Sequence, residues 1–263
     1  MRTADDPRPT VIALHSSGAG GRQWEPYRAL IDPAWDWHAP DLLGYDAATP
    51  WPLGAATSLA AEARRIGALI DRLDTDPVHL VGHSYGGSVA LQVALQQPEQ
   101  VASLTLYEPV RFALLRHADD ALWRDIVDTG RRIGVLALSG GLQASAQVFV
   151  DYWSGEGAWG RLPPARQDAV ARRMPKVQAE FEALFADTTP LAAYRALRMP
   201  VRVVRGTASP APARRVARRL AEACPRGELL QLAGGDHMLP LAQPGRFAAL
   251  LPCRVENGVR VAA

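Results

Sequence analysis

The feature that most constrains the fold is an alternation of short apolar runs with segments of helical periodicity. The runs TVIAL (10–14), VHLV (78–81) and VASLTLY (101–107) are short and mostly apolar. Between them, segment 58–73 places its apolar residues on one helical face. Buried strands separated by helices are typical of a parallel sheet whose faces are covered by helices. The sequence therefore predicts an α/β fold with a mostly parallel sheet flanked by helices.

The alternation stops after the third of these runs. Residues 111–198 contain only helical patterns, and strand-like runs return at 201–206 and 228–233. A long stretch of helical patterns between strands indicates an insertion into the α/β unit. We therefore predict a helical cap over 111–198, inserted into a core formed by residues 1–110 and 199–263.

Composition narrows the range of partners. The 263 residues are 48% hydrophobic and 21% charged, and the formal net charge is only +2, so nothing favours nucleic acid or a membrane surface as partner. The sequence has no run of about 18 apolar residues that could span a membrane, and its N-terminus lacks a secretory h-region. Cys224 and Cys253 are isolated and lack metal-ligand spacing. We expect a cytoplasmic protein without a metal site.

The most specific motif is GHSYG (82–86), a G-x-S-x-G pattern between a strand-like run and a helical segment. In this setting a sharp turn places the middle residue, Ser84, in a strained backbone at the edge of the sheet. The small flanking glycines avoid collisions in the turn, and the following helix directs its positive end toward developing negative charge. The alternative is a tight turn around an exposed serine that has no chemical role.

With this motif in its setting, the sequence resembles the α/β-hydrolase family over nearly its whole length. The resemblance implies that the 111–198 segment is the family's cap. Only about nine residues precede the first run, so the N-terminal hairpin of the family is expected to be absent. The matching segments are LHSSGAGGRQW (14–24) for the oxyanion loop, APDLLGYD (39–46) for the next strand and turn, GHSYGG (82–87) for the nucleophile turn, and GGDHM (234–238) for the histidine loop.

The resemblance also implies the catalytic base and the oxyanion donors. A serine nucleophile needs a base, and among the six histidines His237 comes late in the chain, as the family order of nucleophile, acid and base requires. The N–H of Tyr85, directly after the nucleophile, is expected to hold the oxyanion. The family places the second donor in the early loop, which here gives the N–H of Ser17. The loop reads His15-Ser16 where His-Gly is common, so Ser16 must adopt the backbone of that glycine.

The acid is expected at an uncommon position. Many family members place it after the strand that corresponds to 201–206, but here Ser209 occupies that place and no acid follows the strand. Some members place it one strand earlier, and there the run 101–107 ends on Glu108. We therefore predict Glu108 as the third triad member; the alternative is a salt bridge from Glu108 to an arginine of the cap, such as Arg111. Asp236 is adjacent to the histidine and is interpreted as a turn residue.

Four further residues are candidates for substrate binding, each with an alternative in packing or loop bracing. Aromatic side chains in an insertion above a catalytic edge suggest an apolar acyl or aryl substrate, although they could equally hold the core of the cap. A histidine on the early loop braces that loop in similar proteins. The four candidates are His15, Trp24, Trp153 and Trp159.

Together these features predict a serine hydrolase that cleaves a carboxylic ester, a lactone or a thioester of a small molecule through an acyl-enzyme. No metal or organic cofactor is implied. A second possibility is hydrolysis of a carbon–carbon bond in ring-cleavage diketones, which similar capped enzymes perform with the same triad. A third is a pseudoenzyme that keeps the fold and only binds a small molecule.

Overall fold

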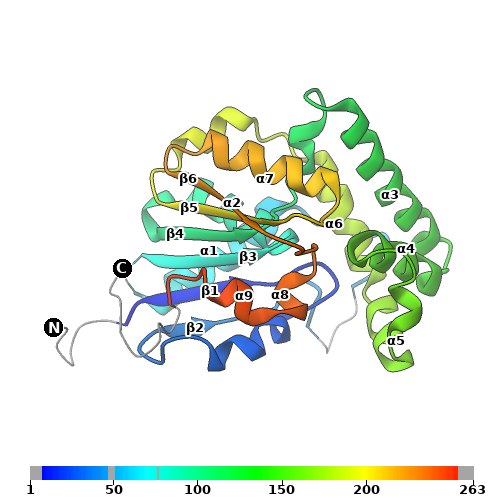
Figure 1. Cartoon of the computed structure of the whole chain (residues 1–263), viewed down its shortest axis with the longest axis horizontal. Coiled ribbons are helices and arrows are strands. Elements are labelled where there is room, and N and C mark those ends of the chain that lie inside the picture. Colours follow the sequence, from blue (N-terminus) through cyan, green and yellow to red (C-terminus); the bar gives the residue numbers. More distant parts are fainter. Residues whose placement is uncertain (1–7, 47–50, 76, 254–263) are drawn as a thin grey trace.

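A computed structural model of the chain describes residues 8–46, 51–75 and 77–253. Its centre is a sheet of six parallel strands in the order β2-β1-β3-β4-β5-β6, shown in Figure 1. The predicted parallel sheet is confirmed. The expected lack of an N-terminal hairpin concerns residues 1–7, which lie outside the described part of the chain. The strands are β1 (Thr10–Leu14), β2 (Asp36–His38), β3 (Val78–His83), β4 (Val101–Tyr107), β5 (Val201–Gly206) and β6 (Gly227–Leu232).

Helices cover both faces of the sheet, as the apolar strands require. Side chains alternate along a strand, so neighbouring residues of β1 enter different cores. Ile12 and Leu14 join the core under the first group of helices, and Val11 and Ala13 join the core under the second. The first group is α1 (Leu59–Leu73), α2 (Tyr85–Gln96) and α7 (Ala211–Ala223), and the second is the 3-10 helix η1 (Gly21–Ala29) with α8 (Leu239–Ala242) and α9 (Pro244–Ala248).

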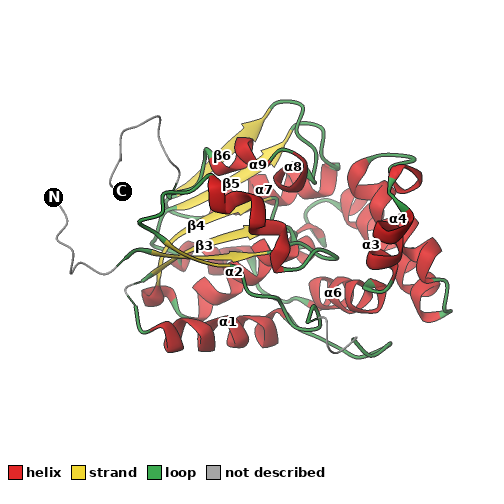
Figure 2. Ribbon diagram, turned by 90° about the horizontal axis from the view of Figure 1, so that it is seen from below, coloured by secondary structure: helices red, strands yellow, loops and turns green. Residues whose placement is uncertain are grey.

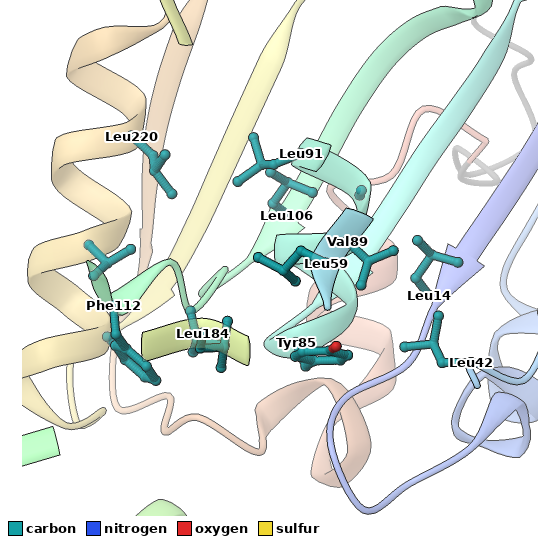
Figure 3. Packing of buried hydrophobic residues seen from close by; sticks show 14 of the residues in the cluster. Leu14, Leu42, Leu59, Tyr85, Val89, Leu91, Leu106, Phe112, Leu184 and Leu220 are labelled. Atoms are coloured by element: carbon teal, nitrogen blue, oxygen red, sulfur yellow. The ribbon is translucent and has the colours of Figure 1, made fainter. Parts of the chain in front are cut away.

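Four α-helices lie between β4 and β5 in the sequence and gather at one end of the sheet (Figures 1 and 2). They share the first core with the sheet: Phe112 and Leu184 belong to the same cluster of buried residues as Tyr85 and Leu59, and Figure 3 shows Leu184 between Phe112 and Tyr85. We call residues 111–198 the helical insertion. Its α-helices are α3 (Asp120–Leu138), α4 (Leu142–Ser154), α5 (Pro164–Ala171) and α6 (Met174–Ala186), and its short 3-10 helices are Phe112–Leu115, Trp159–Arg161 and Leu191–Ala196. A further 3-10 helix, Pro98–Gln100, precedes β4.

A buried arginine ties the two ends of the helical insertion together. Arg111, four residues after the end of β4, is fully buried and forms an ion pair with Asp187 after α6, with Nε 3.1 Å from Oδ2. Its Nε also donates to Tyr194 Oη at 2.6 Å. A buried charge is tolerated only when it is paired. Arg111 therefore fixes where the insertion leaves and rejoins the core.

Candidate active site

Ser84 occupies the turn between β3 and α2 in the strained conformation that the motif predicts. Its φ of 55° is unusual for a residue with a side chain. The neighbouring glycines are needed because side chains there would collide with backbone. A Cβ on Gly82 would lie 2.5 Å from Gly87 Cα, and one on Gly86 would lie 2.3 Å from Leu14 O. The turn thus holds the Ser84 side chain at the end of β3.

His237, on the loop after β6, lies next to this serine. Its Nε2 is 2.9 Å from Ser84 Oγ, although the two residues are 153 positions apart in the sequence. Two side chains of the sheet hold the backbone of this loop. His83 Nε2 bonds to the His237 carbonyl at 2.8 Å, and Tyr107 Oη donates to the Asp236 carbonyl at 2.6 Å. The carboxylate of Asp236 accepts the N–H of Met238 at 2.9 Å. Asp236 therefore shapes the turn, as the sequence indicated.

Glu108 completes the group from the end of β4. Its Oε2 lies 2.6 Å from His237 Nδ1, and its Oε1 accepts the N–H of Gly206 at 2.7 Å. Like Ser84, it has a positive φ, 44°, which bends the chain at the strand end. The alternative of a salt bridge to Arg111 is wrong, because Arg111 pairs with Asp187 instead. Both carboxylate oxygens of this buried side chain are thus committed to the histidine and to β5.

The histidine beside the nucleophile has a supporting position that sequence reasoning did not identify. Burial lowers the pKa of His83 well below its usual value of 6.5, so its ring is neutral. A neutral ring has one donor and one acceptor nitrogen. Nε2 donates to the His237 carbonyl, and Nδ1, 3.1 Å from Gln23 Nε2, accepts from that amide. The sequence placed His83 beside Ser84 but gave no sign of these distant partners.

The early loop is braced by His15, which lies within the fold with no exposed surface. Its Nε2 accepts the N–H of Leu42 at 3.0 Å, and its Nδ1 contacts both the Ser16 carbonyl at 2.8 Å and the N–H of Gly20 at 3.1 Å. Burial lowers the pKa of His15 to about 4, which keeps the ring neutral. The structure thus gives this candidate for substrate binding a role in loop bracing.

Ser16 fits the loop without strain, although a glycine is common at its position. It is not among the residues with positive φ. Its N–H and its hydroxyl both donate to Gln23 Oε1, at 3.0 and 2.9 Å. Two residues later, the N–H of Gly18 donates to Tyr45 Oη at 2.8 Å. These bonds commit the N–H groups on either side of Ser17.

The helical insertion lies directly over the histidine. Trp153 on α4 stacks on the His237 ring, with centroids 4.0 Å apart and planes inclined by 29°. Trp153 and His237 are 4% and 2% exposed, and Ser84 is 5% exposed, so the group is covered. On the other side, a Cβ on Gly18 would lie 3.5 Å from Phe149, which places this aromatic ring against the early loop.

Two other candidates for substrate binding pack elsewhere. Trp24 has no exposed surface and belongs to the core on the η1 side of the sheet, where its ring contacts those of Tyr27, Trp37 and Phe247. This corrects its assignment to the pocket. Trp159 is 9% exposed and packs in the shared core of the sheet and the insertion. Both positions are explained by the burial of large apolar rings.

Within the described ranges, no group of three or more His, Cys, Asp or Glu side chains could hold a metal ion. In the same part of the chain, no helix is long and apolar enough to cross a membrane.

Comparison with known proteins agrees with the fold. A model of the alpha/beta hydrolase family matches residues 11–250, so the chain belongs to that family. It is 36% identical over 118 residues to lipase LipV of Mycobacterium tuberculosis, covering 45% of this chain and 42% of the lipase. Over 118 residues it is 31% identical to 2-hydroxy-6-oxo-2,4-heptadienoate hydrolase of Pseudomonas putida, covering 43% and 42%.

The matched segment spans less than half the length of these curated relatives. Among solved structures, the enol-lactonase of Burkholderia xenovorans superposes with a TM-score of 0.75 at 18% identity, covering 94% of this chain and 91% of the lactonase. At this low identity, the likeness establishes a common fold. The matching family model supports hydrolase activity.

Proposed function

We propose that the protein is a serine hydrolase that cleaves a carboxylic ester through an acyl-enzyme. The observation that carries the proposal is the continuous set of contacts from Gly206 N–H through Glu108 and His237 to Ser84 Oγ. Such a set fixes the tautomer of the histidine, because Nδ1–H donates to the carboxylate and Nε2 is left to accept the serine proton. The three groups therefore act as nucleophile, base and acid.

In the proposed reaction, Ser84 Oγ attacks the carbonyl carbon while its proton passes to His237 Nε2. The Glu108 carboxylate stabilises the imidazolium that forms. The N–H groups of Tyr85 and Ser17 hold the negative oxygen, and the flanking commitments of Ser16 and Gly18 support Ser17 as the donor from the early loop. The alkoxide leaves with the proton from His237, and water then attacks the acyl-enzyme by the same route.

The surroundings of Ser84 favour an uncharged ester of a small or medium apolar acid. Trp153 and Phe149 present aromatic surface from the insertion, which we propose as a cap over the acyl group. The relative from Pseudomonas putida acts on a dienoate, which carries a carboxylate. Here the nearby cations already have partners: Arg173 donates to two carbonyls of the early loop, and Lys176 pairs with two glutamates. This favours the ester over the carboxylated diketone.

A substrate panel on the purified protein tests the proposal. The panel contains p-nitrophenyl acetate, butyrate and octanoate, a γ-lactone, an acyl thioester and a 2-hydroxy-6-oxo-dienoate. We expect the highest kcat/KM on a p-nitrophenyl ester and loss of that activity in Ser84→Ala, with Ser139→Ala at the exposed end of α3 as the matched control. A preference for the dienoate would instead establish carbon–carbon bond hydrolysis. Binding without turnover of any substrate would identify a pseudoenzyme.

A further inference from the structure

The early loop is held from the side of the helical insertion as well as from the core. Arg173, at the start of α6, donates from Nη1 to the carbonyl of Gly18 at 2.8 Å and also to that of Ala19. Its guanidinium also lies 5.6 Å from the centre of the Tyr45 ring. A side chain more than 150 positions away in the sequence therefore contacts the segment that follows Ser17.

A second connection runs through Tyr45. Its hydroxyl accepts the N–H of Gly18 at 2.8 Å and donates to Glu180 Oε2, on α6, at 3.0 Å. Burial raises the pKa of Tyr45 well above its usual value of 10, so the phenol keeps the proton that it donates to the carboxylate. The hydroxyl is thus a bridge between α6 and the loop.

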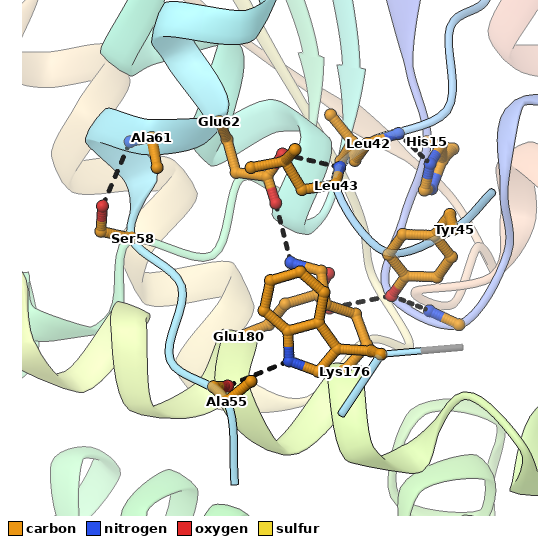
Figure 4. Close-up of polar contacts among 12 residues, drawn as sticks. His15, Leu42, Leu43, Tyr45, Ala55, Ser58, Ala61, Glu62, Lys176 and Glu180 are labelled. Atoms are coloured by element: carbon orange, nitrogen blue, oxygen red, sulfur yellow. Dashed lines mark hydrogen bonds and ion pairs between the residues drawn. The ribbon is translucent and has the colours of Figure 1, made fainter. Parts of the chain in front are cut away.

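The carboxylate at the end of this bridge is itself fixed. Glu180 and Lys176 lie on α6 without exposed surface, with Nζ 3.5 Å from Glu180 Oε1 and 2.7 Å from Glu62 Oε1 on α1. Glu62 Oε2 accepts the N–H of Leu43 at 3.0 Å, as Figure 4 shows. Buried charges of this kind are strongly destabilising if one partner is removed. The group Glu62, Lys176 and Glu180 therefore anchors the insertion to the core beside the early loop.

These contacts act on the peptide planes around the proposed oxyanion donor. A peptide unit is planar and trans, so its C=O and its N–H point in opposite directions. The Ser16 carbonyl accepts the backbone N–H of Ala19 and lies 2.8 Å from the His15 ring nitrogen Nδ1, which turns the Ser17 N–H the other way. The peptide unit between Ser17 and Gly18 is fixed by the bond from Gly18 N–H to Tyr45 Oη. The following unit, between Gly18 and Ala19, is fixed by the bond from Arg173 to the Gly18 carbonyl. The loop dihedrals after Ser17 thus depend on α6.

We propose that Arg173 and Glu180 of α6, the latter through Tyr45, are positioning residues that orient the Ser17 N–H for the oxyanion. In this proposal the helical insertion contributes to stabilisation of the oxyanion in the chemical step, in addition to any role in substrate selection. This inference rests on the proposed function. Displacing a donor by about 1 Å costs up to a hundredfold in rate, and losing one costs about a hundred- to a thousandfold.

The test is Tyr45→Phe, which removes one hydroxyl and keeps the ring, with Tyr152→Phe as the matched control. The hydroxyl of Tyr152 bonds to Asp125 on the exposed side of the insertion. With the best ester, we expect kcat of Tyr45→Phe to fall about 10- to 100-fold with KM within about threefold. The affinity for an alkyl boronic acid, which mimics the tetrahedral intermediate, should fall by the same factor. The control should match wild type in both.

A second variant keeps the proposal testable if Tyr45→Phe does not fold. Arg173 is half-buried, so Arg173→Met should be tolerated; it should lower kcat in the same way, and Arg173→Lys should restore part of it. The neighbouring exposed Arg172→Met is the control.

Two results would overturn the inference: folded Tyr45→Phe and Arg173→Met with kcat within twofold of wild type, or losses confined to KM. If the wild type hydrolyses no ester, both this inference and the proposed function fail. An active wild type with unaffected variants rejects the inference alone.

Discussion

Replacing Glu108 by glutamine tests the proposed acid, and the structure shows why the substitution is severe. The two carboxylate oxygens accept from different donors, His237 Nδ1 at 2.6 Å and Gly206 N–H at 2.7 Å. An amide has only one oxygen. If that oxygen faces Gly206, the NH₂ group faces Nδ1 and forces the histidine proton onto Nε2. A protonated Nε2 can no longer accept the proton of Ser84. If the amide is reversed, its NH₂ group meets the Gly206 N–H.

Either arrangement also removes the charge that stabilises the imidazolium. We expect kcat to fall about 100- to 10,000-fold with KM nearly unchanged, which is a barrier increase of about 3 to 5 kcal/mol. The assay is p-nitrophenyl ester hydrolysis under saturating substrate, with Glu182→Gln on the exposed face of α6 as control. Ser209 lies beside Gly206, so adding Ser209→Asp should partly restore the rate. A Glu108→Gln enzyme within about threefold of wild type would refute this reasoning.

Three further predictions concern the scaffold. Gly86→Ala should abolish soluble expression or activity, because the new Cβ would lie 2.3 Å from a carbonyl oxygen of β1; a fully active variant, measured on the same ester, would contradict the described turn. Arg111→Met should lower the free energy of unfolding by about 3 kcal/mol in urea titrations because it leaves Asp187 unpaired, and an effect below about 0.5 kcal/mol would show that the pair is dispensable. The pKa of His15 in the folded protein, about 4, lies below its usual value of 6.5. The unfolded chain therefore binds a proton more readily between pH 4 and 6.5, so the free energy of unfolding should fall as the pH drops from 6.5 to 4. His15→Gln should flatten this pH dependence and the control His117→Gln should not; an unchanged pH dependence in His15→Gln would count against a neutral buried ring.

The sheet could be predicted from the sequence because its signals are local. Apolar runs between helical repeats gave β1, β4 and β5 with the bounds that the structure has. The nucleophile turn was equally local, since its glycines and its flanking strand and helix all lie within one short segment. The position of Glu108 could be predicted because the run 101–107 ends on an acid and because some members of the resembled family place the triad acid after this strand. Its contact with the histidine then follows from parallel strands ending at the same edge.

The supporting contacts could not be predicted, because they join residues that are far apart. Tyr45 and Glu180 are 135 positions apart, and the sequence gives no register between the early loop and α6. Trp24 was misplaced for a related reason: an aromatic residue after a loop fits a pocket or a core equally well until the opposite face of the sheet is known.

The central claim is that Ser84 is the nucleophile, and the most direct measurement is intact-protein mass spectrometry after reaction with an alkyl fluorophosphonate. The account predicts a single adduct on the wild-type protein, located on Ser84 by peptide mapping, and no adduct on Ser84→Ala. The control Ser139→Ala should react like the wild type. An unmodified wild-type protein, or an adduct that persists in Ser84→Ala, would contradict the account.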